Sequence, residues 1–175
     1  MAIAATGEPL NSYKQGEVIA KEAAAIGVNM ILAPVVDINN NSKNPIINIR
    51  SYSDNKDDVV KYSLPFIKGI EENGLISCVK HYPGHGNTAT DSHTKLPVID
   101  ISEEELHGNE LFPFKSACNN DVGSIMVGHI LIPDIDNKYP ATFSKKITEK
   151  ILREDWQYEG LIITDALEMG ALTSE

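Results

Sequence analysis

Residues 75–93 of the chain read LISCVKHYPGHGNTATDSH. The run 75–80 is short and mostly apolar, which predicts a strand, and the glycines and polar residues after it predict a loop. Three of the chain's five histidines, His81, His85 and His93, lie in that loop. A polar loop at the C-terminal end of an apolar strand is typical of a ligand site in an α/β sheet.

The same order of elements recurs along the whole chain. Longer helical segments alternate with short apolar runs, so the expected helices are 13–26, 57–73, 103–120 and 145–156, and the expected strands are 28–38, 75–80, 122–130 and 160–167. Nearly continuous apolar strands are expected where both faces of a parallel sheet are covered by helices. The sequence therefore predicts an α/β fold with a parallel sheet.

Residues that favour helix ends agree with this alternation. The expected N-terminal caps are Asn11 or Ser12 for the first helix, Ser102 with Glu105 for the third, and Ser144 for the fourth, and Asp57 and Asp58 are expected to open the second. Gly27 and Gly74 follow the first two helices, where glycine favours a helix end. Pro65 lies inside the second expected helix and predicts a kink or a later start there.

The composition is that of one globular domain. Of 175 residues, 42% are apolar and 23% are charged, and the formal net charge of -10 argues against a nucleic acid or an anionic membrane as partner. No apolar run approaches the ~20 residues of a membrane span, and residues 1–13 lack the pattern of a signal peptide. The sequence alone does not decide between a cytoplasmic and a secreted or cell-surface location. Cys78 and Cys118 are expected to be free thiols.

Polar residues mark the C-terminal end of every expected strand. They are Asp37, Lys80 with His81, His129 and Asp165. In barrels and in open α/β sheets alike, this end of the sheet carries the ligand site. We therefore expect these side chains to gather at one edge.

The spacing of the histidines is not that of a zinc protease. Pro83 and Gly84 separate His81 from His85, so the pair does not share a helical face, and no glutamate adjoins the first histidine. We expect no metal ion and no other cofactor. Gly84 and Gly86 are expected to serve the backbone, in a tight turn or a close approach to a ligand.

Asp91 and His93 are two residues apart, so in an extended loop their side chains can point to the same side. A carboxylate beside an imidazole fixes the tautomer, raises the imidazole pKa and holds the ring for proton transfer. The alternative is an Asp-turn that leaves the histidine in solvent.

Residues 80–93, KHYPGHGNTATDSH, resemble the signature of family 3 glycoside hydrolases, in the branch of bacterial β-N-acetylglucosaminidases, or β-hexosaminidases. Other stretches resemble further blocks of that family in the same order: ILAPVVDINNNSKNPIINIRSYS, IMVGHILIP, PATFSKKI and GLIITDALEMGAL. The resemblance implies a TIM (β/α)8 barrel, here an incomplete part with about four βα units, since a full barrel needs eight strands and ~250 residues. Residues 1–175 are then expected to be the central part of the N-terminal catalytic barrel domain, with the first and last barrel strands missing.

The resemblance also implies roles for individual residues. Asp165 matches the catalytic nucleophile, and His93 matches the acid/base, with Asp91 as its partner in a dyad. The residues that match sugar-binding positions are Lys80, His81 and Arg50, and those that lie in family blocks with a supporting part in shaping the loops are Asp37, His85 and His129.

The activity that the resemblance implies is retaining hydrolysis of terminal N-acetylglucosamine from chitooligosaccharides or peptidoglycan fragments. An imidazole does not repel phosphate as a carboxylate would, so phosphorolysis is an open alternative, as are an inactive sugar-binding fragment and a metal-dependent hydrolase on the same barrel. The expected partner is an N-acetylglucosamine-containing glycan. Open barrel edges predict self-association of the isolated chain, and an incomplete pocket predicts that it has little or no activity.

Overall fold

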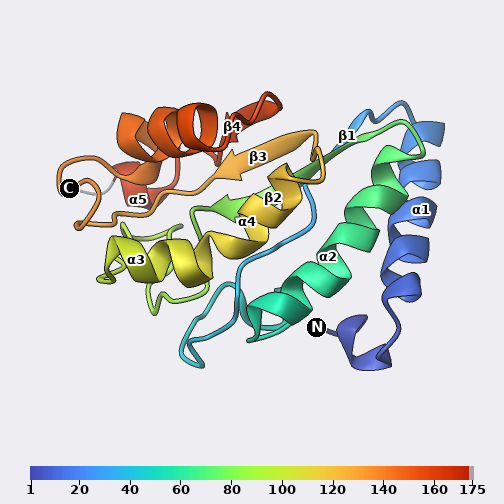
Figure 1. The fold of residues 1–175 in the computed structure, drawn as a ribbon, viewed down its shortest axis with the longest axis horizontal. Coiled ribbons are helices and arrows are strands. Elements are labelled where there is room, and N and C mark those ends of the chain that lie inside the picture. Colours follow the sequence, from blue (N-terminus) through green and yellow to red (C-terminus); the bar gives the residue numbers. More distant parts are fainter. Residues whose placement is uncertain (174–175) are drawn as a thin grey trace.

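The computed structural model describes residues 1–173. Its centre is a parallel sheet of four strands in the order β1-β2-β3-β4. The strands are β1 (Met30–Ile31), β2 (Ile76–Tyr82), β3 (Ser124–Val127) and β4 (Leu161–Thr164). Each strand is added beside the one before it in the chain, as in a (β/α) barrel, and β1 and β4 are the two edges. The predicted α/β fold is confirmed as an incomplete barrel (Figure 1).

Helices connect the strands, and α1 and α2 lie side by side at one end of the sheet (Figure 1). The longer helices are α1 (Pro9–Ala25), α2 (Lys56–Glu71), α4 (Phe112–Cys118) and the π-helix η5 (Lys146–Asp155). The short ones are η1 (Ala4–Thr6), η2 (Asn48–Arg50), α3 (Glu103–Glu105), the π-helix η3 (Leu106–Glu110), η4 (Ala141–Phe143) and α5 (Gly170–Thr173). Within residues 1–173, no helix is both long enough and apolar enough to cross a bilayer.

The first helix begins earlier than predicted. Pro9 is its first residue, a position where the missing N–H costs no hydrogen bond and the fixed φ suits a helix. Asn11 and Ser12 therefore lie inside α1, and neither is its cap. Ser12 is instead buried, and its hydroxyl donates to Tyr62 O at 2.7 Å, which ties α1 to α2.

The first strand is much shorter than the predicted 28–38, because Pro34 has no N–H to donate to the ladder. The chain still follows β2 beyond Ile31. Cys78 N donates to Ala33 O at 2.9 Å, and Val36 N donates to Lys80 O at 2.9 Å. This irregular continuation brings Asp37 to the C-terminal end of β2.

The second helix is capped by Asn55, whose side-chain oxygen accepts from the backbone N–H groups of Asp57 and Asp58 at 2.8 and 3.3 Å. The two aspartates lie in the first turn of α2, as predicted, where their negative charges interact favourably with the helix dipole. The later start predicted from Pro65 is wrong, since α2 is helical on both sides of it.

The third expected helix is divided into α3, η3 and α4. Ser102 Oγ accepts from Glu105 N at 3.1 Å, which confirms the predicted cap. Pro113 lies in the first turn of α4, where it is tolerated, so a new helix begins there. In the fourth, Ser144 Oγ accepts from Ile147 N at 3.4 Å, and η5 begins at Lys146, one residue later than predicted.

The main apolar core lies around β2 and β3. Tyr82 is fully buried there, with its ring edge-on to Phe114 and Trp156 at centroid distances of 5.5 and 6.1 Å. Its hydroxyl donates to Ile147 O at 2.9 Å. A second cluster between α1, α2 and the start of β2 consists of Ala20, Phe66, Ile70 and Leu75. Both clusters fix β2, and both cysteines are free, as predicted.

Gly16 and Gly69 let the backbones of α1 and α2 touch. A Cβ atom at Gly69 would lie 2.2 Å from Tyr13 O, and one at Gly16 would lie 2.4 Å from Phe66 O. We expect Gly69→Ala to lower the free energy of unfolding by about 1–3 kcal/mol, because overpacking outweighs the gain in helix propensity. Urea denaturation measures the change.

Gly108→Ala is the matched control, because no atom lies within 4 Å of the Cβ position at Gly108. We expect this control to leave the free energy of unfolding unchanged or slightly higher. An equal loss in both variants would contradict the packing explanation.

Candidate functional site

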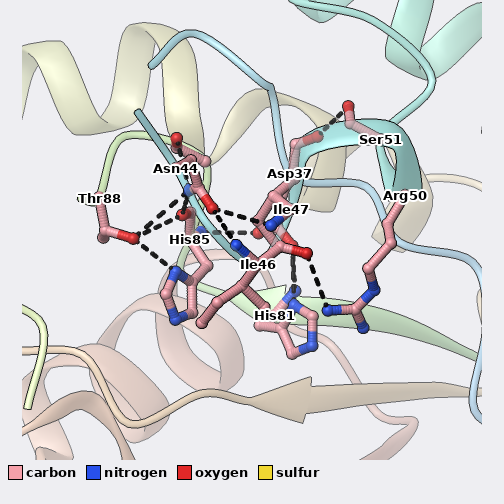
Figure 2. A network of polar contacts seen from close by, with 10 residues as sticks. Asp37, Asn44, Ile46, Ile47, Arg50, Ser51, His81, His85 and Thr88 are labelled. Carbon is pink, nitrogen blue, oxygen red and sulfur yellow. Dashed lines mark hydrogen bonds and ion pairs between the residues drawn. The ribbon is translucent and has the colours of Figure 1, made fainter. Parts of the chain in front are cut away.

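The buried carboxylate of Asp37 joins the loop after β1 to the loop after β2 (Figure 2). Its Oδ2 accepts from His81 N at 3.1 Å and lies 2.8 Å from His81 Nδ1, and its Oδ1 accepts from His85 N at 2.7 Å. Burial by itself would raise the pKa of Asp37, but the His81 ring and the His85 N–H outweigh it, so the pKa is lowered. Asp37 therefore stays ionised and holds both histidines in place.

An ionised Asp37 also fixes the tautomer of His81. The carboxylate can only accept, so His81 Nδ1 carries the proton, and the other ring nitrogen, Nε2, is left for a ligand. The Lys80–His81 peptide bond is cis, as is the Tyr82–Pro83 bond. His81 thus lies at the end of β2 with one donor committed to Asp37 and its outer nitrogen unused within residues 1–173.

Asn44 holds the loop after β1 against the histidine loop, as Figure 2 shows. Its Nδ2 donates to His85 O at 2.7 Å and to Gly86 O at 2.9 Å, and its Oδ1 accepts from Ile46 N and Ile47 N at 2.9 and 2.8 Å. The side chain is buried, and all its main hydrogen-bonding positions are filled. Asn44 is not among the site residues predicted from the sequence, because one asparagine in a polar, asparagine-rich loop gives no distinctive signal.

The two loop glycines have the backbone roles expected of them. A Cβ atom at Gly86 would lie 1.6 Å from Ile38 O, so only glycine permits this approach of the two loops. Gly84 has φ +125°, a conformation that other residues rarely adopt.

His85 and His129 are supports within the loops. His85 is buried, its Nδ1 lies 2.8 Å from Thr88 Oγ1, and burial lowers its pKa, although Asp37 opposes the shift. His129 lies 2.6 Å from Thr142 Oγ1 through Nδ1, and its Nε2 lies 2.9 Å from Ala166 O. The second contact fixes the loop that follows β4.

Asp165 is the first residue after β4, and two backbone contacts orient it. Its N–H donates to Val127 O at 2.9 Å, and its Oδ1 accepts from Ala166 N at 2.8 Å. Contacts with Val127 and with His129, which lie in and just after β3, thus fix the backbone on both sides of the Asp165 carboxylate. The side chain is partly exposed.

Lys80 lies close enough to Arg50 and Asp165, which come from two other segments, for their charges to act on its ammonium. Burial lowers the pKa of Lys80, the nearby Arg50 guanidinium lowers it further, and the carboxylates of Asp165 and Asp37 oppose the shift. A cavity of about 460 Å³ beside β1 is lined by Arg50 and Lys80 together with apolar side chains. The structure therefore brings two cations and the carboxylate of Asp165 within electrostatic reach of one another.

The expected contact between Asp91 and His93 is present, and it takes the form of a turn. Asp91 Oδ1 accepts from His93 N at 2.8 Å and lies 2.7 Å from His93 Nδ1. The His93 N–H is the main cause of a lowered Asp91 pKa, and the His93 ring adds to it. The His93 side chain is 64% exposed. The two alternatives drawn from the sequence, a carboxylate–imidazole pair and an Asp-turn with a solvent-exposed histidine, therefore occur together.

The loop that carries this pair is anchored next to the segment that follows Asp165. Gly170 N donates to His93 O at 3.0 Å, and Ala171 N donates to Ser92 O at 3.0 Å. Within residues 1–173, no hydrogen bond or ion pair joins His93 to Asp165. The structure thus anchors the backbone of this loop to the segment that follows Asp165, while the His93 ring faces solvent.

Comparisons with known proteins point to one family. The sequence model of one protein family, described as the glycosyl hydrolase family 3 N-terminal domain, matches residues 1–175. The chain is 38% identical over 172 residues to beta-hexosaminidase A of Pseudoalteromonas piscicida, a match that covers 91% of this chain and 29% of that protein.

Two solved structures extend the likeness to the fold. A glycoside hydrolase family 3 beta-N-acetylglucosaminidase from Paenibacillus sp. str. FPU-7 has a TM-score of 0.96 and 39% identity, over 99% of this chain and 33% of that one. The beta-glucoside phosphorylase BglX has a TM-score of 0.94 and 29% identity, over 98% and 33%. The chain thus spans about a third of the length of these relatives.

We expect Asn44→Asp to lower the free energy of unfolding by about 2–5 kcal/mol, because a carboxylate cannot donate. Gly86 O then loses its Asn44 donor, and within residues 1–173 His85 O keeps only Thr88 Oγ1, at 3.1 Å. Thermal or urea denaturation measures the loss. Asn41→Asp, in the same loop, is the matched control. Asn41 Oδ1 only accepts from Lys43 N, a role that aspartate keeps, so a comparable loss there would refute the specific part given to Asn44.

Proposed function

Because the chain belongs to glycosyl hydrolase family 3, we propose that it carries the reacting groups of a retaining β-N-acetylglucosaminidase. The observation that carries the proposal is the placement of the Asp165 carboxylate at a strand end opposite the Lys80 ammonium, with the Asp91–His93 pair on a loop hydrogen-bonded to the residues after Asp165. A retaining glycosidase needs two groups that flank the glycosidic bond, a nucleophile on one side and a proton donor on the other.

In the first step, Asp165 attacks the anomeric carbon of N-acetylglucosamine while the bond to the leaving oxygen breaks. His93 in its imidazolium form donates the Nε2 proton to that oxygen, because Nδ1 is held by Asp91. The product is a glycosyl ester on Asp165 and a free leaving sugar. In the second step, neutral His93 takes a proton from water, the water oxygen attacks the anomeric carbon, and Asp165 is released as carboxylate.

Asp91 makes an imidazole suitable for both steps. An ordinary histidine titrates near pH 6.5, so both of its forms are accessible near neutrality. The ionised Asp91, whose pKa is held low by the His93 N–H and ring, favours the imidazolium before the first step and again after water is deprotonated.

Arg50, Lys80 and His81 would hold the sugar. Lys80 and Arg50 can donate to hydroxyl oxygens from the side of β1 and β2, and His81 offers its Nε2 from a ring fixed by Asp37. The substrates that fit the family are chitooligosaccharides and peptidoglycan fragments with a terminal N-acetylglucosamine.

Phosphorolysis is the second candidate. The exposed His93 ring carries no negative charge that would repel phosphate, and one structural relative is named a phosphorylase. Assaying sugar 1-phosphate with and without inorganic phosphate separates the two reactions.

We expect His93→Ala to lower kcat/KM by about 10²–10⁴ on an N-acetylglucosaminide with a poor leaving group, because proton donation is lost. The loss should be much smaller on a dinitrophenyl substrate, whose leaving group needs no proton. The assay is made on the whole polypeptide in which residues 1–175 occur. His107→Ala, which removes another exposed histidine, is the control, and equal losses on both substrates would contradict the acid/base role.

We also propose that the purified 175-residue chain self-associates through its open edges and turns over little or no substrate. Within residues 1–173, β1 and β4 each have a neighbouring strand on one side only, and Leu32 and Ile49 beside β1 are 48% and 74% exposed. Sedimentation should show an average mass that rises with concentration. A monomer at every concentration, or clear turnover of an aryl N-acetylglucosaminide, would contradict this expectation.

A further inference from the structure

Glu110 is a buried carboxylate that the mechanism above does not use. It ends the π-helix η3 and is 2% exposed, and within residues 1–173 it and Asp37 are the two buried acidic residues. The two carboxylates differ in the hydrogen-bond donors that would stabilise their negative charge. Asp37 receives two backbone N–H groups and an imidazole, whereas Glu110 receives only neutral amides on one oxygen.

The contacts of Glu110 reach both loops of the sugar site. Its Oε1 accepts from Asn40 Nδ2 at 2.7 Å, in the loop after β1, and from Asn109 Nδ2 at 3.2 Å. Its Oε2 is buried and has no partner within residues 1–173. The carboxyl group lies against the loop after β2, since a Cβ atom at Gly84 would lie 3.2 Å from Oε2 and 3.0 Å from Glu110 Cβ.

Gly84 transmits any movement of Glu110 to the histidines. Gly84 N donates to His81 O at 2.8 Å, and the next residue, His85, donates its N–H to Asp37 at 2.7 Å. A carboxyl group that shifts against Gly84 would therefore displace the backbone that orients His81 and Asp37.

The charged groups that face Glu110 disfavour its ionised form. Burial raises its pKa to about 6, the Asp37 and Glu105 carboxylates raise it as well, and the Asn40 and Asn109 amides oppose them. Within residues 1–173, Lys56 in the first turn of α2 forms no ion pair with Glu110, and its ammonium donates to Gly108 O at 2.6 Å. Burial lowers the pKa of His85, beside Gly84, which disfavours a positive charge there.

We propose that Glu110 is a positioning residue of the sugar site: its protonated carboxyl group holds the loops after β1 and β2 together, and its ionisation loosens them and weakens sugar binding. An ionised Oε2 would be a buried charge without a donor, next to a second carboxylate, and would have to move towards water. The inference rests on the proposed function, because the bound sugar reports the geometry of the loops.

The test compares the wild-type protein with Glu110→Gln, which keeps the shape and cannot ionise, in the whole polypeptide in which residues 1–175 occur. KM and kcat for an aryl N-acetylglucosaminide are measured from about pH 5 to about pH 8. If only the protonated form binds well, wild-type KM rises by up to about tenfold per pH unit above about 6, and KM of the variant does not. The kcat profiles remain alike, since the reacting groups are intact. Glu104→Gln, which removes an exposed charge from the same segment, retains the wild-type profile.

A second measurement needs no substrate. The pKa of Glu110 is raised from 4.5 to about 6 in the folded state, so between these pH values the folded chain keeps a proton that the unfolded chain releases. The melting temperature of the wild type should therefore fall, relative to that of Glu110→Gln, as the pH rises through this window. If the wild type turned over no N-acetylglucosaminide, the proposed function would fail, and the melting series alone would decide whether Glu110 titrates as a buried acid.

Asn40→Ala provides a variant on an exposed loop if Glu110→Gln does not fold. It removes a hydrogen bond that lowers the pKa of Glu110, so the rise in KM should move to higher pH. The proposal is overturned if Glu110→Gln keeps the wild-type pH dependence of KM, if its melting-temperature difference is independent of pH, or if Asn40→Ala leaves the midpoint unchanged.

Discussion

The geometry of the site depends on one buried charge, the carboxylate of Asp37. An unpaired ion away from water costs several kcal/mol, so the chain must bring donors to it. It does so with the backbone N–H groups of His81 and His85 and with the ring of His81. Asn44 then closes the two loops over this centre. Glu110, the other buried carboxylate, lacks such donors, which is why its protonation can matter to the same loops.

The site is divided into a fixed part and an exposed part. Lys80 and His81 lie near the end of β2 and Asp165 follows β4, strands whose register is set by the sheet, and His129 fixes the backbone after Asp165. The Asp91–His93 pair lies on a loop whose imidazole faces solvent, although its backbone is bonded to the start of α5. In the proposed mechanism the fixed part holds the sugar and the nucleophile, and the loop delivers the proton.

The sequence predicted the alternation of helices and strands, the parallel sheet and the Asp91–His93 contact, because apolar periodicity and residue spacing are local signals. It misjudged the start of α1 and the length of β1, where Pro9 favours a helix start and Pro34 interrupts the ladder. Asn44 and Glu110 could not be found, since their importance arises only when loops distant in the sequence meet. The roles of the reacting residues came from the family resemblance rather than from spacing.

The central claim is that the strand-end carboxylate of Asp165 forms the bond to the sugar. The most direct measurement is to trap the glycosyl-enzyme with a slow fluorinated N-acetylglucosaminide, in the whole polypeptide in which residues 1–175 occur, and to map the labelled peptide. The label should lie on Asp165, after the strand Leu161–Thr164. A label on Asp91 or on any other residue would contradict the claim.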